Sequence, residues 1–372
     1  MSEPIYSPGL EGIIAGETAV SSILGGLQYR GYAIEDLARH ATFEETAYLL
    51  LHGELPRREE LDSFRNRLGA SAVLPAPVVD ALRQVPKTAP MMDVMRTGAS
   101  LLAHWDPEVG DNSHEANLRK SERLLAQLPL VMTAAQRMRQ GQAPIAPDPQ
   151  RSLAGNVLWM LSGRPPSERS ERAMDVSLVL YAEHEFNAST FTSRVVASTL
   201  ADLHSAITAA IGALKGSLHG GANERVLEVL QQVGSAARAE AWIRDALAKK
   251  VRIMGFGHRV YKTGDPRARF LKTLCGELAA ETGHQDMEAM AETIERIVTT
   301  EKKLPPNLDW PSARLYHYLG LPVDLYTPLF VISRVAGWSA HVIEQHDNNR
   351  LIRPLARYTG EVNRRWRPME ER

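Results

Sequence analysis

Three histidines and one aspartate stand in segments rich in glycine, proline or other polar residues. His184 lies between two apolar stretches, His219 precedes a Gly-Gly pair, His258 follows a Gly-Phe-Gly run, and Asp309 follows Pro-Pro-Asn-Leu. A carboxylate can remove a weakly acidic C–H proton, and a neutral imidazole can donate a hydrogen bond to the enolate that results. The set is therefore suited to carbon–carbon bond chemistry.

Cationic side chains cluster after the third histidine and recur near the end of the chain. They are Arg259, Lys262, Arg267, Arg334 and Arg353. A guanidinium can hold a carboxylate through two parallel hydrogen bonds. We therefore expect an anionic substrate, and a dicarboxylate fits the number of arginines.

Each of these residues also has an ordinary structural interpretation. His184 could be a histidine satisfied at a helix end, and Gly220-Gly221 could be a helix-breaking turn. The basic segment around His258 could be a solvated turn before a helix. Asp309 could be a helix N-cap, the commoner role for an aspartate in that position.

Other chemistries find less support in the sequence. The histidines are separated by 35 and 39 residues (219 − 184 and 258 − 219), which is not short-range metal-ligand spacing, and HExxH and CxxC are absent. GxGxxG after a strand, GxSxG and GxxxxGK[ST] are absent as well. We predict no metal site, although three histidines meeting in space keep a metal-dependent lyase as an alternative.

Composition predicts an ordinary globular protein. Of 372 residues, 44% are hydrophobic and 23% charged, with a net charge of −1. That charge gives no general attraction to nucleic acid or to an anionic membrane. The single cysteine, Cys275, excludes an internal disulfide, and neither a signal peptide nor a membrane span is apparent. We expect a cytoplasmic protein.

The elements that must position these residues are mostly helices. Residues 9–31 suggest extended segments and turns, with a hairpin at 13–20. A capping box at Thr42–Glu45 opens a helix that ends at Gly53. Further helices are expected at about 56–69, 91–105, 115–141 with a kink at Pro129, 156–161, 167–182, 190–214, 224–233, 236–250, 265–283, 287–302 and 325–345. The fold class is therefore mainly α.

Two stretches differ in texture from the rest. The helix at 205–214 has almost no charge, so it is expected to be buried all round or to pack closely on another helix, for example in a dimer. Residues 222–320 are more charged than the block before them, and could form a smaller second domain.

Several motifs together resemble the citrate synthase family. The segments Gly-Ser-Leu-His219-Gly-Gly-Ala-Asn, Gly-Phe-Gly-His258-Arg-Val-Tyr-Lys with Asp-Pro-Arg267, and Pro-Asn-Leu-Asp309 resemble its three signature segments. Glu-His184-Glu-Phe-Asn187-Ala-Ser is similar to its oxaloacetate-binding segment. Residues 27–37, 333–338 and 352–354 resemble further motifs of the family. The motifs occur in order between about residues 9 and 360.

The resemblance implies a two-domain helical fold with the active site in the cleft. The large domain would comprise residues 1–221 and 321–372, and the small domain residues 222–320. It also implies a homodimer that condenses an acyl-CoA with oxaloacetate and then hydrolyses the thioester, without a metal or other cofactor.

Catalytic roles follow from the resemblance residue by residue. Asp309 would be the base at the acyl carbon, His219 would hydrogen-bond the thioester oxygen, and His258 would act as the acid at the oxaloacetate carbonyl.

Binding roles follow in the same way. Oxaloacetate would be held by His184, Asn187, Arg267, Arg334 and, from the partner subunit, Arg353. Coenzyme A would lie along Gly255, Phe256, Gly257, Arg259 and Lys262.

The sequence departs from many members of the family directly after Asp309, where Trp310-Pro311 stands beside the expected acyl site. Some 2-methylcitrate synthases have a similar pairing. A single methyl group in an apolar pocket discriminates by only about 1–3 kcal/mol. We expect a citrate synthase that uses acetyl-CoA, with a 2-methylcitrate synthase that uses propionyl-CoA as the alternative. A third alternative is a non-catalytic protein that binds coenzyme A or a carboxylate.

Overall fold

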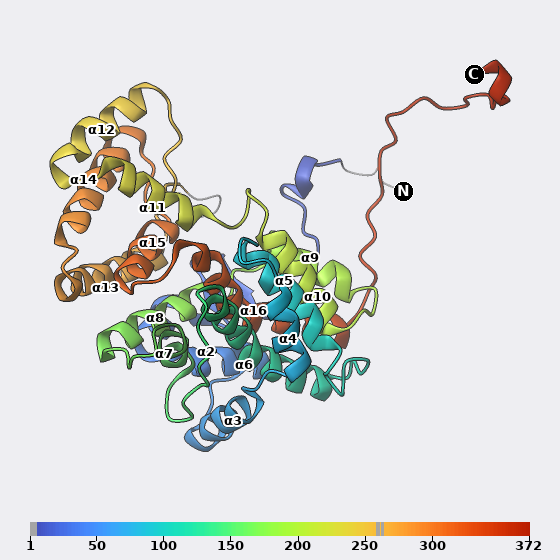
Figure 1. The fold of residues 1–372 in the computed structure, drawn as a ribbon. Helices are drawn as coiled ribbons and strands as arrows, with labels where there is room; N and C mark the ends of the chain where they lie inside the picture. Colours follow the sequence, from blue (N-terminus) through green and yellow to red (C-terminus); the bar gives the residue numbers. More distant parts are fainter. Residues whose placement is uncertain (1–5, 258–260, 262–263) are drawn as a thin grey trace.

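The computed structural model describes residues 6–257, 261 and 264–372, and helices dominate it (Figure 1). The α-helices are α1 (Ile34–His40), α2 (Phe43–His52), α3 (Arg58–Ser71), α4 (Ala76–Gln84), α5 (Met91–Ala103), α6 (His114–Arg139), α7 (Leu153–Ser162), α8 (Glu168–Tyr181), α9 (Ala188–Ala197), α10 (Leu203–Leu214), α11 (Ala222–Val233), α12 (Ala236–Ala248), α13 (Pro266–Thr282), α14 (Gln285–Lys302), α15 (Asp309–Tyr318) and α16 (Tyr326–Asp347). Short 3-10 turns are η1 (Pro8–Leu10), η2 (Val323–Leu325) and η3 (Met369–Glu371). The predicted mainly α class is confirmed.

A small antiparallel sheet precedes the helices. Its strands β1 (Ser21–Ser22), β2 (Gln28–Tyr29) and β3 (Tyr32–Ala33) lie in the order β1-β2-β3. The hairpin that we expected at residues 13–20 therefore forms further along the chain. Gly25 and Gly26 form its first turn, because both have a positive φ that glycine adopts without a steric penalty.

The predictions made from the strongest local signals, the capping box and the glycine stop of α2, are confirmed. In the capping box of α2 the Glu45 N–H donates to Thr42 Oγ1 at 3.3 Å, and the Thr42 N–H donates to Glu45 Oε2 at 2.8 Å. Gly53 ends this helix in the left-handed conformation, with φ 90°. Pro129 lies inside α6, which continues as one helix from His114 to Arg139.

The segment at 190–214, which was predicted as one helix, forms two helices. Leu200 takes a positive φ of 65°, and Asp202 then caps α10 by accepting the Ser205 N–H at 2.9 Å. Only one face of α10 is buried within the chain. Ser205 and Gly212 on the opposite face are exposed, so the helix is not buried all round.

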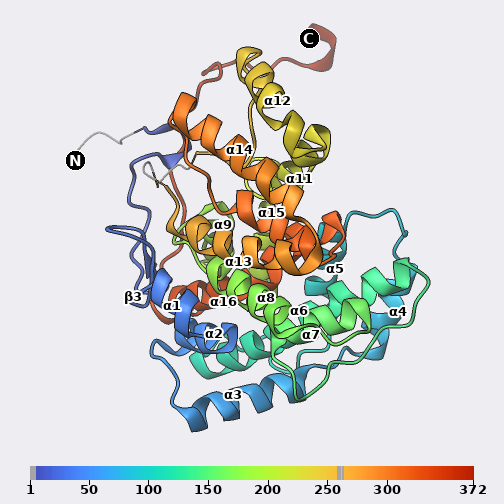
Figure 2. The ribbon, with the colours of Figure 1, turned by 90° about the vertical axis from the view of Figure 1, so that its left-hand side faces the viewer.

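α16 is the central helix of the larger group, and 18 of its residues are buried. It packs on α2, α5, α6, α8, α9 and α10. α11 to α15 form a second group, at the upper left of Figure 1. α13 joins the two groups by packing on α8 and α1 (Figure 2). After α16 the chain runs away from the helical body (Figure 1). Within the described part of the chain, no helix is both long and apolar enough to traverse a bilayer.

Candidate active site

Residues from five separate segments meet where the two helix groups adjoin. The segments are the end of α8, the start of α9, the turn before α11, the start of α15 and the first half of α16. Side chains that link them include Tyr181, His219, Asp309, Phe330 and Arg334. The site can form only when the complete fold brings these distant parts of the chain together.

Asp309 is the first residue of α15 and does not cap it. The residue before the helix is Leu308, and the Asp309 N–H donates to Asn307 Oδ1 at 3.1 Å. The Asp309 side chain instead accepts a hydrogen bond from the Tyr181 hydroxyl, at 3.0 Å from Oδ1. The interpretation of Asp309 as a helix N-cap is therefore wrong.

The environment of Asp309 raises the pKa of its carboxyl group. Burial is the main cause, and it is opposed by the Tyr181 hydrogen bond and by the positive charge of Arg267. A carboxylate with a raised pKa is a stronger base once it is ionised. The Tyr181 hydroxyl is itself held by Ser312, whose Oγ lies 2.8 Å away.

His219 is oriented by the N-terminus of α9. Its Nε2 accepts the Ser189 N–H at 3.3 Å and lies 2.8 Å from Ser189 Oγ. A nitrogen that accepts a backbone N–H has no proton of its own, so the neutral ring carries its proton on Nδ1. Burial, and then the charge of Arg334, lower the pKa of His219 to about 4. His219 is therefore a neutral hydrogen-bond donor at physiological pH.

Ser189 and Asn187 form the support behind His219. The Ser189 hydroxyl oxygen accepts the Trp338 indole N–H at 3.1 Å and lies 2.8 Å from Asn187 Oδ1. Asn187 caps α9 by accepting the Thr190 N–H at 3.1 Å. The side chain of Asn187 thus fixes the helix end whose N–H groups face His219.

Two buried arginines bring positive charge to the site. Arg267 forms a bidentate ion pair with Asp265, at 3.0 Å from Nε to Oδ1 and 2.9 Å from Nη2 to Oδ2. Arg334 donates from Nε to the Tyr181 carbonyl at 2.7 Å, and its Cζ lies 4.6 Å from the Phe330 ring centroid. Burial lowers the pKa of Arg334 to about 10, so it stays charged at neutral pH.

Aromatic rings connect the charged groups. Phe330 packs against Tyr181 at a centroid distance of 4.7 Å and against His219 at 6.2 Å. Tyr261 packs edge-on against His184 at 5.7 Å, and Arg267 Cζ lies 5.9 Å from the centroid of the same tyrosine ring. Arg267 Nη1 also donates to the Leu180 carbonyl at 3.5 Å, next to Tyr181, and this bond links the pair of His184 and Tyr261 to the group around Asp309, His219 and Arg334.

The glycine-rich segment lies directly beside the segment that carries Asp309. The Gly257 N–H donates to the Pro305 carbonyl at 2.8 Å, and the Asn307 N–H donates to the Gly255 carbonyl at 2.9 Å. Gly255 and Gly257 have φ angles of 87° and 76°, which glycine tolerates best. His258, Arg259 and Lys262, which were predicted to act in this segment, lie outside the described residues.

Arg353 and Trp310, which were also expected at the site, make none of the contacts described so far. Arg353 is exposed on the chain segment that follows α16. Trp310 is fully buried, with its ring 4.6 Å from that of Phe256 and 5.5 Å from Arg314 Cζ. Within the described ranges, no group of three or more His, Cys, Asp or Glu residues is arranged to hold a metal ion.

Sequence reasoning missed Tyr181, Ser189 and Phe330. Tyr181 and Phe330 lie inside or at the end of apolar helical patterns, where a tyrosine or phenylalanine is usually a core residue, whereas Ser189 belongs to the His184 segment but was given no role. For Tyr181 the only available signal was its position three residues before His184.

Comparisons with known proteins all indicate one family. A family model described as "Citrate synthase, C-terminal domain" matches residues 9–355. Citrate synthase 2 of Bacillus subtilis is 48% identical over 366 residues, and 2-methylcitrate synthase 2 of Corynebacterium glutamicum is 47% identical over 372. These matches cover 98% of this chain, and 98% and 97% of the two relatives.

Solved structures agree with the sequence relatives. The citrate synthase of Pyrobaculum aerophilum superposes with a TM-score of 0.92 at 37% identity, covering 99% of this chain and 97% of that one. The Thermoplasma acidophilum citrate synthase, solved as a ternary complex with carboxymethyl coenzyme A and oxaloacetate, also gives 0.92 at 33% identity, with 99% and 100% covered.

Proposed function

The chain belongs to the citrate synthase family of acyltransferases, and from this membership we propose that it condenses acetyl-CoA with oxaloacetate and releases citrate and free coenzyme A. The observation that carries the proposal is the juxtaposition of a buried carboxylate, a neutral histidine and two buried arginines. Tyr181 completes this arrangement by donating a hydrogen bond to the carboxylate.

Asp309 removes a proton from the carbon next to the thioester. That carbon is a far weaker acid than a carboxylic acid, so the reaction needs a second group that stabilises the enolate as it forms. The Nδ1–H of His219 donates to the thioester oxygen. A preorganised donor of this kind contributes about 3–4 kcal/mol to the transition state. The neutral imidazole donates this hydrogen bond from Nδ1, the nitrogen that carries its one proton.

The nucleophilic carbon then attacks the carbonyl group of oxaloacetate, and His258 is proposed to supply the proton to the new hydroxyl group. The two buried arginines and His184 hold the oxaloacetate carboxylates and the carbonyl oxygen that becomes the new hydroxyl group. Arg267 remains paired with Asp265, which fixes its guanidinium in one orientation. Asn187 is proposed to belong to the same substrate site, because it caps α9, the helix whose first N–H groups face His219. Water then hydrolyses the thioester, and the reaction needs no metal or other cofactor.

Coenzyme A is proposed to lie along residues 255–257, with Arg259 and Lys262 at its phosphates. Of the backbone groups there, the Gly255 carbonyl and the Gly257 N–H pair with residues 305–307. The Gly257 carbonyl accepts the Asn307 amide. These bonds fix the segment beside Asp309, so a thioester bound along it would present its acyl carbon to the base.

We propose that residues 222–320 form a small domain and that residues 1–221 and 321–372 form the large one. The grouping of α11 to α15 supports these limits (Figure 1). The active form is proposed to be a homodimer. Its support is the exposed uncharged face of α10 and the extended segment after α16, which carries Arg353 toward a partner's site.

A second candidate is a 2-methylcitrate synthase that uses propionyl-CoA. It is favoured by the 47% identity to a relative of that name. The two substrates differ by one methyl group, so a few contacts at the acyl site decide between them. A non-catalytic binding protein is disfavoured, because a binder has no need for a carboxylate with a raised pKa and a dedicated donor.

The test is the release of free coenzyme A, followed with a thiol reagent in the presence of oxaloacetate. We expect kcat/KM for acetyl-CoA to exceed that for propionyl-CoA by about tenfold, or about 1.4 kcal/mol. The reverse preference would make the enzyme a 2-methylcitrate synthase. The Asp309→Asn variant serves as the control and should lose about 10³-fold in kcat while it still binds oxaloacetate. Absence of release by the wild-type protein would exclude both enzymes.

A further inference from the structure

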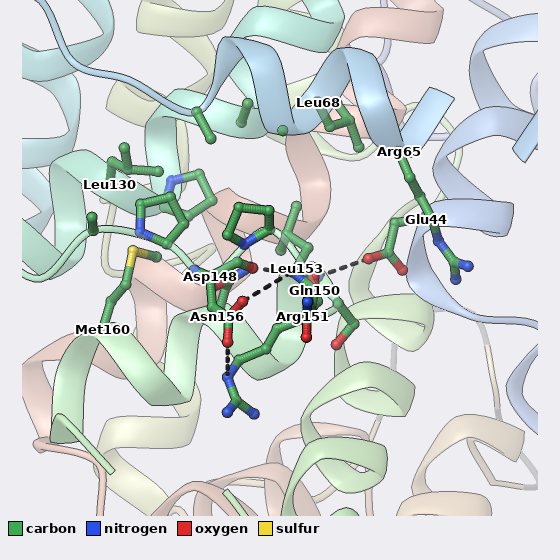
Figure 3. A pocket seen from close by; sticks show the side chains of 18 of the residues that line it. Glu44, Arg65, Leu68, Leu130, Asp148, Gln150, Arg151, Leu153, Asn156 and Met160 are labelled. Atoms are coloured by element: carbon green, nitrogen blue, oxygen red, sulfur yellow. Dashed lines mark hydrogen bonds and ion pairs between the residues drawn. The ribbon is translucent and has the colours of Figure 1, made fainter. Parts of the chain in front are cut away.

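A second site lies away from the proposed active site. A cavity of about 480 Å³ is enclosed by α3, α6, the start of α7 and the proline-rich loop before α7 (Figure 3). Cavities of about 300–1,000 Å³ are typical of small-molecule sites. None of the residues that line it belongs to the catalytic cluster.

One side of the cavity is apolar. Leu68, Pro129, Leu130, Pro147 and Met160 are among the residues that line it. Leu130 and Met160 lie together at one end in Figure 3, opposite Glu44 and Arg65. A ligand would thus have an apolar part at the first end and polar groups at the other.

Glu44 is the main polar group of the cavity, and among the described residues only one of its two carboxylate oxygens accepts a hydrogen bond. The residue is 3% exposed, and its Oε1 accepts the Leu153 N–H at the start of α7, at 2.7 Å. Its Oε2 is buried and has no hydrogen-bond partner within the described part of the chain. A buried carboxylate oxygen without a partner is costly, so a bound donor would stabilise it.

Arg65 supplies the complementary group at the same end. Its Nη2 makes a long contact of 3.5 Å with Thr42 Oγ1, and its Nε is buried without a hydrogen-bond partner among the described residues. The other two charged side chains at the cavity, Asp148 and Arg151, pair with each other at 3.2 Å. Arg151 Nε also lacks a hydrogen bond among the described residues, but the charge of Arg151 is paired with Asp148, so Glu44 and Arg65 are the two charged groups at the cavity for which the described residues supply no ion pair.

The surroundings favour a positive charge next to Glu44. Asp175 lies close behind it, accepting the Phe43 N–H at 2.9 Å. Burial, and then the charge of Glu44, raise the pKa of Asp175 to about 7. Arg172 already pairs with Asp175 at 3.0 Å, whereas the described residues supply no ion pair to Glu44, so a cation in the cavity would reduce the remaining repulsion between the two carboxylates.

We propose that this cavity binds a small zwitterion with an apolar or aromatic side chain, of the α-amino acid type. Its ammonium group donates to Glu44 Oε2, its carboxylate accepts from Arg65, and its side chain packs on the apolar wall. The two charged groups of an α-amino acid are adjacent, and Glu44 and Arg65 both line the same end of the cavity (Figure 3).

The test is direct binding to the intact protein by calorimetry, with three matched probes. L-Phenylalanine carries both charges, phenethylamine lacks the carboxylate, and 3-phenylpropanoate lacks the ammonium group. We expect L-phenylalanine to bind and each truncated probe to bind about tenfold more weakly or worse. Glu44→Gln and Arg65→Met should weaken the amino acid to a similar degree. Glu59→Gln, at an exposed position of α3, is the control and should leave binding unchanged.

Gly69→Leu provides an independent blocking variant. Gly69 lines the cavity within α3, and a Cβ atom added there meets nothing within 4 Å. The new side chain should fill the cavity and abolish binding without lowering Tm, since leucine has a higher helix propensity than glycine. The proposal is overturned if no probe binds at millimolar concentration, if phenethylamine binds as well as the amino acid, or if Gly69→Leu still binds it. Because none of these measurements involves turnover, they stand apart from the proposed catalytic activity.

Discussion

At Asp309 two influences act on the same carboxyl group in opposite directions. Burial raises its pKa, and the hydrogen bond from the Tyr181 hydroxyl lowers it. The tyrosine is therefore proposed to tune the base so that it is ionised at neutral pH while it remains stronger than an exposed aspartate. Tyr181 itself stays protonated, because burial and the charge of Asp309 raise its own pKa.

Tyr181→Phe should shift the acidic limb of the kcat–pH profile to higher pH, by about one unit. Removal of the hydrogen bond takes away an interaction that favours the ionised carboxylate, so the pKa of Asp309 rises. The profile between pH 5 and 9 measures this directly. Tyr316→Phe is the matched control, since Tyr316 is equally buried but its hydroxyl lies 2.6 Å from Ser177 Oγ. An unshifted limb in Tyr181→Phe would contradict the tuning role.

His219 should make the protein less stable as the pH falls from about 6.5 to about 4. The pKa in the folded state is about 4, below the ordinary value of 6.5, so in this window the unfolded chain takes up a proton that the folded protein does not. At pH 5 this removes about 2 kcal/mol of unfolding free energy relative to pH 8.

Denaturant unfolding of the wild type and of His219→Gln at both pH values measures this difference. The variant should lose about 2 kcal/mol less than the wild type on acidification. His40→Gln, at an exposed position, is the control and should behave like the wild type. Equal losses in the wild type and His219→Gln would show that the ring is protonated normally in the folded state.

At the scale of the helices, Gly337 of α16 packs directly against residues 182 and 183, which precede His184 of the candidate site. A Cβ atom added to Gly337 would lie 2.2 Å from Glu183 Oε2 and 2.4 Å from the Ala182 carbonyl oxygen. Glu183 is in turn held by His341 Nε2 at 2.9 Å and by the Ser21 hydroxyl at 3.0 Å. The segment directly before His184 is thus fixed from two sides.

Gly337→Ala should therefore push this segment away from α16. We expect a loss of about 1–3 kcal/mol in unfolding free energy, and a higher KM for oxaloacetate with a smaller change in KM for acetyl-CoA. Steady-state kinetics with each substrate varied separately provide the measurement. Gly276→Ala in α13 is the control, because this exposed glycine has nothing within 4 Å of an added Cβ atom, and the variant should leave stability equal or higher. If the KM for oxaloacetate is unchanged in Gly337→Ala, then Gly337 does not help to position the segment before His184.

The sequence predicted elements where the local signals were strong. The capping box at Thr42 and the helix after Asp265 depend on neighbouring residues, so they could be predicted from the sequence. The break between α9 and α10 could not, because a positive φ at Leu200 runs against the preference of leucine and depends on tertiary packing.

The candidate site could likewise be predicted only as far as its signals are local in the sequence. The motifs marked His219 and Asp309, but their hydrogen-bond partners lie 30 and 128 residues away along the chain, at Ser189 and Tyr181. Trp310 was placed beside the acyl group only because it follows Asp309 in the sequence, and that placement stays a prediction. Its burial against Phe256 is a property of how two segments pair in space.

At the scale of the whole molecule, the proposed dimer requires each site to borrow Arg353 from its partner. Asp309→Asn and Arg353→Ala homodimers should each be nearly inactive. Mixing them under conditions that exchange subunits should restore activity, because half of the dimers then contain one site with both residues intact. We expect about a quarter of the wild-type kcat per subunit after full random exchange.

Activity assays before and after exchange provide the measurement. The Asp309→Asn protein exchanged with itself is the control and should stay inactive. If activity does not recover although exchange is verified by mass, then Arg353 acts within its own subunit or plays no part.

The extended segment after α16 has a consequence for the life of the protein in the cell. Leu355, Tyr358, Val362 and Trp366 are each at least 70% exposed, so in an unassembled subunit they present an accessible peptide to any protease. Assembly as proposed would cover that peptide. A subunit without a partner would be trimmed first, and trimming before Arg353 would leave it unable to complete a neighbour's site. The same segment would thus act as a proofreading device, which removes orphan subunits before they dilute the working enzyme.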